Sequence, residues 1–270
     1  MLTEERQSLI LSMLNQRGSL SNMEIRRKLR VSRETVRRDL VQLAERHALR
    51  KTHGGALALE SSEPAIAVRE VINAGGKRAI GRRAASLVPD GATVMLGSGS
   101  TMQAVADALF DRQGLTVITN SLAIAGKFAG RNRNRVYVLG GEIQAANGST
   151  LGRDATAMLA HYFADFAFVG VGAIAPDGGL MDYTREEGEL YDLMLKSART
   201  AVVAADHTKF NRHAPVRVGS LAKATHLVTD RRPQAPLASA LATLSLAVLV
   251  CGDGRGGERT PRPRRPRLRR

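Results

Sequence analysis

The chain has 270 residues, of which 43% are hydrophobic and 4% aromatic, with one cysteine, no tryptophan and a net charge of +15. This length suits two domains of about 100–200 residues each, with aliphatic, alanine-rich cores. The single cysteine excludes an internal disulfide framework and a clustered thiolate zinc site, and we expect Cys251 to be a small buried hydrophobe at a strand end. The sequence shows neither a run of 18 apolar residues nor a signal peptide, which predicts a cytoplasmic protein without a membrane span.

The positive charge is distributed unevenly along the chain. Residues 1–60 carry 12 Lys/Arg and 7 Asp/Glu, a net charge of +5, whereas residues 61–253 carry 20 and 17, a net charge of +3. The last 17 residues, 254–270, carry eight Arg and one Glu, a net charge of +7. The composition therefore makes nucleic acid a candidate partner without showing which face would bind it.

The first two predicted helices lie within residues 1–30. Apolar residues recur at helical spacing from Leu9 to Leu14, and Gly18 ends that helix. The segment Ser21–Glu24 has the form Ser-x-x-Glu, a capping box that starts a second helix. Ile25 and Leu29 are the apolar positions of this second helix.

A third helix follows after a turn of about three residues, 30–32. Ser32 is its predicted cap, and Val36, Leu40 and Leu43 fall at i, i+4 and i+7, which predicts one buried stripe. Two capped helices joined by such a short turn are typical of a helix-turn-helix.

The segments after the third helix predict a wing and a connection. Residues 49–56 have the pattern of a short hairpin with Gly54-Gly55 as its turn. Residues 59–64 suit a linker, and residues 65–88 predict a helix interrupted around Gly75-Gly76.

The polar face of the third helix carries the candidate DNA contacts. Arginine can bind guanine O6 and N7 with two hydrogen bonds, and hydroxyls can reach phosphates. The alternative is a solvated basic face, which we disfavour because the capping signals, the short turn and the basic wing agree. The candidate DNA-binding residues are Ser21, Ser32, Arg33, Thr35, Arg37, Arg38, Lys51 and His53.

From Gly91 onward, short apolar segments alternate with helical stretches. Near-continuous apolar runs indicate strands buried on both faces, and this rhythm predicts an α/β domain with a mainly parallel sheet. The predicted strands are 93–96, 116–119, 136–139, 166–171, 200–205, 226–229 and 244–251.

A Gly/Ser loop follows the first of these strands. Residues 97–101, Gly-Ser-Gly-Ser-Thr, run into a helix start, an arrangement that lets an anion approach backbone amides. A plain strand-to-helix connection is the alternative. Two further polar or Gly-rich strand ends, 119–121 and 140–142, favour a ligand crevice, because ligands collect at the carboxyl ends of strands in open α/β sheets.

Two motifs resemble those of DeoR-type repressors. Val31–Leu40 matches the helix Val-Ser-x-x-Thr-(Val/Ile)-Arg-Arg-Asp-Leu, and Arg50–Ala56 matches the wing that follows it. The similarity extends to about Cys251, and the run Ala205–Phe210 is most similar to glycerol-3-phosphate regulon repressors. The resemblance implies a second domain with a fold similar to ribose-5-phosphate isomerase, which senses a phosphorylated sugar or polyol.

The resemblance and the loop pattern together give the candidate effector residues: Ser98, Gly99, Ser100, Thr101, Thr119, Asn120, Gly140, Gly141, Asp182, Glu187, Asp206 and Lys209. For Asp206 and Lys209 the alternative is a surface ion pair. The chain departs from the family pattern at two places. Gly97 stands where members often carry Asp, and residues 189–192 are less basic than usual.

We therefore expect a helix-turn-helix domain at 1–58, a linker and the start of a connecting helix at 59–74, a sensor domain at 75–251 and a disordered tail at 252–270. The expected function is repression of a sugar or polyol operon by a homo-oligomer, a dimer or tetramer, that needs no metal or cofactor. An isomerase-like enzyme is the alternative, but nothing places a carboxylate such as Glu142 as a catalytic base. The tail is either a passive end or a source of extra phosphate contacts.

Overall fold

The computed structural model describes residues 2–17, 19–45, 49–52, 54–58, 63–64, 66–145 and 147–251. The chain divides into two compact units, Met1–Arg69 and Glu70–Arg270, and each is described by itself. The predicted Arg-rich tail lies outside the described residues. No helix in the described part of the chain is long and apolar enough to cross a membrane.

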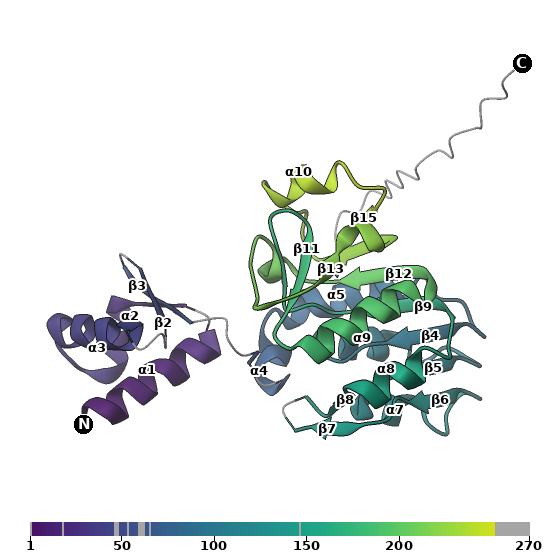
Figure 1. The fold of residues 1–270 in the computed structure, drawn as a ribbon, viewed down its shortest axis with the longest axis horizontal. Helices are drawn as coiled ribbons and strands as arrows, with labels where there is room; N and C mark the ends of the chain where they lie inside the picture. Colours follow the sequence, from purple (N-terminus) through teal and green to yellow (C-terminus); the bar gives the residue numbers. More distant parts are fainter. Residues whose placement is uncertain are drawn as a thin grey trace, which may run out of the picture. The chain divides into compact units, whose positions relative to one another are not determined.

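The first unit is a winged helix-turn-helix (Figure 1). Its core is built from the predicted stripe of the third helix, together with Ile10, Leu14, Ile25 and Leu29, whereas Leu9 is exposed. Its elements are α1 (Thr3–Arg17), β1 (Ser19–Ser21), α2 (Asn22–Leu29), α3 (Arg33–Glu45), β2 (Leu49–Thr52) and β3 (Gly55–Ala58).

The wing is a three-stranded antiparallel sheet in the order β1-β3-β2. The sequence predicts the β2–β3 hairpin but not β1, which pairs Ser21 with Gly55. A Cβ atom on Gly55 would lie 2.0 Å from the Leu20 carbonyl oxygen, so this glycine is needed for the close approach of β1 and β3.

The connecting segment forms two helices, α4 (Ile66–Val71) and α5 (Ala74–Ala85). The interruption predicted around Gly75-Gly76 is present but lies earlier in the chain, because both glycines are inside α5. The break falls at Asn73, whose φ of 50° places it in the left-handed region that Asn tolerates better than most residues.

The second unit contains a seven-stranded sheet in the order β15-β14-β12-β9-β4-β5-β6, with every neighbouring pair parallel. All seven predicted strands are present, and the predicted α/β class is confirmed. The strands are β4 (Thr93–Leu96), β5 (Thr116–Thr119), β6 (Arg135–Val138), β9 (Ala164–Val169), β12 (Ala198–Ala204), β14 (His226–Thr229) and β15 (Ala247–Val250).

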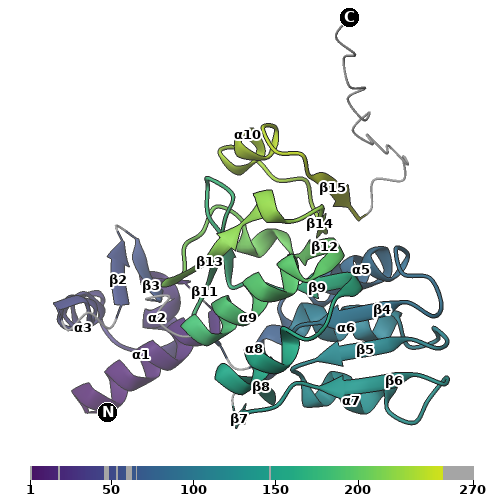
Figure 2. The same cartoon turned by 45° about the vertical axis from the view of Figure 1, so that its right-hand side comes forward.

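Helices cover both faces of this sheet (Figure 2). Along β4, Val94 and Leu96 pack with one core cluster and Met95 with the other, which explains the uninterrupted apolar run. One face carries α5, α6 (Ser100–Ala108) and α7 (Leu122–Phe128), and the other carries α8 (Arg153–Leu159), α9 (Arg185–Lys196) and the short α10 (Leu237–Leu241).

Two smaller antiparallel elements were not predicted. A hairpin of β7 (Glu142–Gln144) and β8 (Ser149–Leu151) follows β6. A second sheet has the order β10-β11-β13, with β10 at Ala173–Ile174, β11 at Gly179–Asp182 and β13 at Val216–Ser220. Both additions follow strand ends of the large sheet and border its carboxyl edge.

Candidate DNA-binding and effector sites

Helix α3 presents a basic face and buries the opposite one. Val36, Leu40 and Leu43 lie in the core of the first unit, as predicted. Arg33, Arg37 and Arg38 are exposed, and Thr35 is half-buried. The three arginines therefore share the solvent side of the helix whose N-terminal end carries base contacts in a helix-turn-helix.

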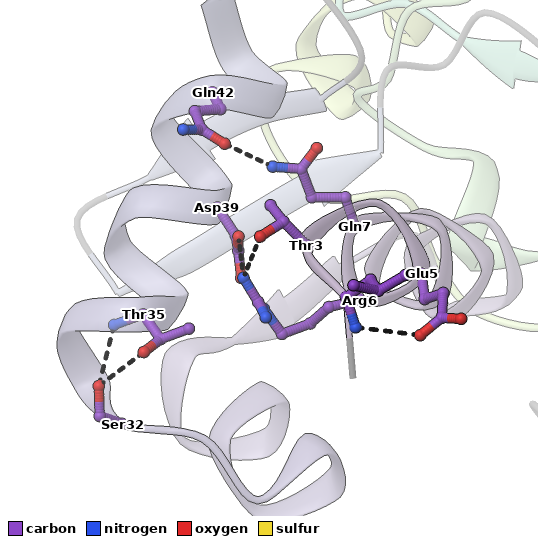
Figure 3. Close-up of polar contacts among 9 residues, drawn as sticks. Thr3, Glu5, Arg6, Gln7, Ser32, Thr35, Asp39 and Gln42 are labelled. Carbon is purple, nitrogen blue, oxygen red and sulfur yellow. Dashed lines mark hydrogen bonds and ion pairs between the residues drawn. The ribbon is translucent and has the colours of Figure 1, made fainter.

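Two of the predicted DNA contacts serve as helix caps. The Ser21 hydroxyl accepts from the Glu24 amide at 3.2 Å, and Glu24 Oε2 accepts from the Ser21 amide at 2.8 Å, which completes the predicted capping box. The Ser32 hydroxyl accepts from the Thr35 amide at 3.0 Å and shares a hydrogen bond with the Thr35 hydroxyl at 2.8 Å (Figure 3). These caps fix the N-termini of α2 and α3.

A buried ion pair that the sequence analysis missed ties α3 to α1. Arg6 Nε and Nη2 donate to the two carboxylate oxygens of Asp39 at 2.5 Å and 2.9 Å (Figure 3). The Asp39 side chain is only 2% exposed. One turn further along, Gln7 Nε2 donates to Gln42 Oε1 at 2.7 Å. These contacts hold the two helices together on their polar edges.

Glu34 pairs with two of the arginines on the exposed face. Arg37 donates to both Glu34 carboxylate oxygens at 2.9 Å and 2.7 Å, and Arg38 Nε donates at 3.2 Å. The hydrogen bonds from Arg37, aided by that from Arg38, lower the pKa of Glu34 to about 2. Glu34 therefore remains ionised and offsets part of the positive charge of this face.

The wing and α2 add further cations. Lys51 is exposed on β2, whereas His53 lies outside the described residues. Arg26, Arg27 and Lys28 are exposed in the last turn of α2, although the sequence analysis did not include them. Three consecutive basic residues next to the short turn between α2 and α3 could have identified them in the sequence.

The Gly/Ser loop lies where the strand order of the large sheet reverses. From β4 the chain continues outward to β5 and β6, and from the adjacent β9 it continues outward on the other side. Ligands of open α/β sheets bind outside the carboxyl ends of strands at such a switch point. The segment 97–99 follows β4 at this position, and 170–172 follows β9.

The geometry of this loop leaves the start of α6 without a side-chain cap. Gly97 donates its amide to the Phe168 carbonyl at 3.0 Å, which extends the β4–β9 ladder by one bond. Gly99 is the N-cap of α6 with φ of 110°, and as glycine it brings no capping side chain. Ser98 and Ser100 are buried and Thr101 is half-buried. Backbone amides of the first turn, with the helix dipole behind them, favour a negatively charged group.

The end of β5 is buried beside the β7–β8 hairpin. Thr119 and Ser121 serve the local turn, because the Ser121 amide donates to Thr119 Oγ1 at 3.1 Å and Ser121 caps α7. Asn120 Nδ2 donates to the Thr150 carbonyl at 3.1 Å. Within the described residues, buried Asn120 Oδ1 and buried Ser149 Oγ have no hydrogen-bond partner. Ser149, missed by the sequence analysis, is brought here by the unpredicted hairpin.

The predicted glycines after β6 are placed differently. Gly140 and Gly141 are exposed at the edge strand. Gly141 has φ of 118°, and a Cβ there would lie 2.9 Å from the Leu151 carbonyl oxygen. Its geometry is explained by the turn into β7, without reference to a ligand.

Two predicted carboxylates lie on the second face of the sheet. Asp182 ends β11 and is buried, and a Cβ on Gly172 would lie 3.1 Å from its Oδ1, so its carboxylate borders the segment after β9. Glu187 is buried in the first turn of α9, where its amide donates to the Thr184 hydroxyl at 3.3 Å. Asn147 Nδ2, at the tip of the β7–β8 hairpin, contacts Glu187 Oε1 at 3.4 Å.

The last predicted residues follow β12. Asp206 Oδ1 accepts from the amide and hydroxyl of Thr208 at 3.0 Å and 2.6 Å. Its Oδ2 is buried and has no hydrogen-bond partner in the described structure. Lys209 is half-buried in the same turn.

Asp206 is followed by a network that reaches the start of α5. Asp230, after β14, accepts from the His207 amide at 2.7 Å and from Asn73 Nδ2 at 2.8 Å. Its Oδ2 also lies 2.6 Å from His207 Nδ1. Burial alone would raise the pKa of Asp230, but the hydrogen bonds from Asn73 and His207 together lower it.

A winged helix-turn-helix and an α/β unit with an anion-type loop define a DNA-binding regulator with a sensor domain. The DeoR-like helix-turn-helix domain matches residues 6–62, and the DeoR C terminal sensor domain matches residues 72–231. The chain belongs to the DeoR family of transcriptional regulators, as its motifs indicate.

Relatives span nearly the whole chain. The HTH-type transcriptional repressor CsqR of Escherichia coli is 35% identical over 89% of this chain and 93% of its own length. The glycerol-3-phosphate regulon repressor of Haemophilus influenzae is 34% identical over 83% and 88%. GlcR of Bacillus subtilis, also a transcriptional repressor, is 32% identical over 95% and 99%. The relatives are regulators, so the isomerase-like enzyme alternative is not favoured.

Solved structures that resemble part of this chain include ribose 5-phosphate isomerase A from Methanocaldococcus jannaschii. It is 20% identical, with a TM-score of 0.38 over 51% of this chain and 55% of that one. Pyrococcus horikoshii translation initiation factor eIF-2B is 15% identical, with a TM-score of 0.42 over 84% and 86%.

Proposed function

We propose that this regulator represses an operon for sugar or polyol catabolism and releases DNA when a phosphorylated sugar or glycerol 3-phosphate binds its second unit. The main observation in support is the Gly/Ser loop, residues 97–101, which leads into the start of α6, left without a side-chain cap, at the switch point of the sheet. The glycerol-3-phosphate regulon repressors among its relatives support the same class of effector.

The phosphate group would lie on the first-turn amides of α6, with Ser98, Ser100 and Thr101 as hydroxyl donors. Two buried acceptor oxygens without a hydrogen-bond partner in the described structure, Asn120 Oδ1 and Asp206 Oδ2, would accept hydrogen bonds from the hydroxyl groups of a polyol. Asn120 follows β5, one strand spacing or about 5 Å from β4, and Asp206 follows β12, two spacings or about 10 Å away. A three-carbon polyol phosphate bound at α6 could reach the Asn120 acceptor, whereas a longer hexose phosphate could also reach the Asp206 acceptor.

Of the other effector candidates, Asp182 and Glu187 would border the bound molecule from the second face. Gly140 and Gly141 shape the hairpin turn, and Lys209 follows the Asp206 acceptor. In this proposal all predicted effector residues lie near the carboxyl edge of the sheet. Thr119 and Glu187 would mainly position neighbouring residues through the local hydrogen bonds with Ser121 and Thr184.

On the DNA side, Arg33, Arg37 and Arg38 would contact base edges and phosphates, with Lys51 on the wing. Ser21 and Ser32 would approach phosphates while capping their helices, and Thr35 would approach them from the first turn of α3. We further propose a cytoplasmic dimer or tetramer, because a symmetric oligomer places two recognition helices on two half-sites. An effector with different affinities for the DNA-bound and DNA-free arrangements would shift their populations.

A thermal-shift panel on the full-length protein tests the effector class. We expect glycerol 3-phosphate or a hexose phosphate to raise the melting temperature in a concentration-dependent manner, because a ligand that binds only the native state stabilises it. Glycerol and unphosphorylated glucose are the matched controls. If no phosphate ester shifts the transition, the proposed effector class is wrong.

A further inference from the structure

Tyr191 joins the Gly/Ser loop from the opposite helix. It lies on α9, its ring is buried and the residue is 3% exposed. Its hydroxyl is 2.8 Å from Ser98 Oγ, and the Ser98 amide donates to it at 3.3 Å. Both contacts therefore reach the second residue of the loop that leads into α6.

The hydrogen positions in this contact follow from what each group can donate. The Ser98 amide can only donate, so it occupies one lone pair of the Tyr191 oxygen. When Tyr191 donates to Ser98 Oγ, the serine hydroxyl keeps its own hydrogen for another acceptor. The chain from amide to phenol to serine is then polarised in one direction, which strengthens Ser98 as a donor to an anion.

Gly97 makes room for this arrangement. A Cβ at position 97 would lie 3.0 Å from Tyr191 Cε1 and 3.6 Å from Cδ1, a contact tighter than side chains normally make. The two departures from the family pattern, at Gly97 and within residues 189–192, thus meet at one point. No carboxylate follows β4 directly in this chain, so no side chain at that position would repel a phosphate group, and the Tyr191 hydroxyl lies beside the loop.

We infer that Tyr191 is a positioning residue of the effector site, which holds the Ser98 hydroxyl as a hydrogen-bond donor to the phosphate group, and that Gly97 is required for it. This inference rests on the proposed function.

A double-mutant cycle on the full-length protein tests the inference. Dissociation constants for glycerol 3-phosphate and glucose 6-phosphate are measured by calorimetry for wild type, Y191F, S98A and the double variant. Using the probe that wild type binds, we expect Y191F to weaken binding about three- to tenfold, as for loss of one hydrogen bond. S98A should weaken it at least as much, and the double variant should match S98A because Tyr191 acts through Ser98.

Y162F is the control, because Tyr162 precedes the start of β9 at the opposite edge of the sheet and packs on Tyr137. It should bind like wild type, and melting temperatures without ligand show whether each variant is folded. Additive losses, or unchanged binding by folded Y191F, would overturn the role of Tyr191 while leaving the proposed function intact. If wild type binds neither probe nor any other phosphate ester, the proposed function fails and this inference fails with it.

Discussion

The ion pair between Arg6 and Asp39 offers a test of how α3, the proposed recognition helix, is held. R6A would leave the Asp39 carboxylate, 2% exposed, without the two hydrogen bonds at 2.5 Å and 2.9 Å. Removing one partner of a buried pair costs about 3–5 kcal/mol. Because the Arg6 side chain is itself 12% exposed, we expect the lower value, about 3 kcal/mol.

This loss is large for the unit that contains α3. A unit of this size has a free energy of unfolding of roughly 3–10 kcal/mol, so R6A would remove between about a third and all of it. A loss of 3 kcal/mol corresponds to about 100-fold faster hydrogen exchange of amides that exchange through unfolding of this unit.

Hydrogen exchange with mass spectrometry is the suitable assay. The chain has no tryptophan, and its four tyrosines all lie in the second unit, so fluorescence does not report on α3. R27A, at an exposed position of α2, is the control. A double variant, R6M/D39L, should recover much of the protection, since apolar replacement of a buried pair is often neutral. Unchanged exchange of α3 peptides in R6A would refute this account of the helix anchor.

Three further predictions concern titratable groups. E34Q should raise the affinity for a scrambled DNA duplex about two- to threefold in low salt, because it frees Arg37 and Arg38 and removes a negative charge. Fluorescence anisotropy measures this affinity, and an unchanged value contradicts the pairing. Burial raises the pKa of the Cys251 thiol to about 11, so only roughly one thiol in a thousand is ionised at pH 8. Labelling by iodoacetamide, followed by mass spectrometry, should therefore be slow, and rapid labelling of the folded protein refutes this. The lowered pKa of Asp230 contributes stability that is present above about pH 4 and is lost as the pH falls through the pKa of Asp230 in the folded protein. D230N should therefore reduce the dependence of the melting temperature on pH in the acid range. Parallel acid limbs for D230N and wild type would show that the network is not stabilising.

The features predictable from the sequence are those set by local patterns. The strands of the large sheet were found because burial on both faces gives uninterrupted apolar runs, as in Thr93–Leu96. The caps at Ser21 and Ser32 were found because a cap depends on residues three positions apart. The exposed arginines of α3 that we propose as DNA contacts were found by subtraction, once the buried stripe was assigned.

Features that depend on distant partners were missed. Asp39 lies next to the buried stripe, but its partner Arg6 is 33 residues away. Tyr191 and Ser98 are 93 residues apart, and only the packing of α9 over the strand ends joins them. Strand β1 is three residues long and exists because β3 pairs with it. In each case the sequence shows the residue but not the contact that gives it a role.

The most direct test of the central claim is the anisotropy of a labelled duplex from the region upstream of the protein's own gene. The full-length protein is titrated at fixed salt with and without the phosphate ester that raises its melting temperature. The account predicts a complex stronger than that with a scrambled duplex, weakened at least tenfold by the phosphate ester and unaffected by its unphosphorylated parent. Preferential DNA binding that no phosphate ester alters, or no preference for the upstream duplex, would contradict it.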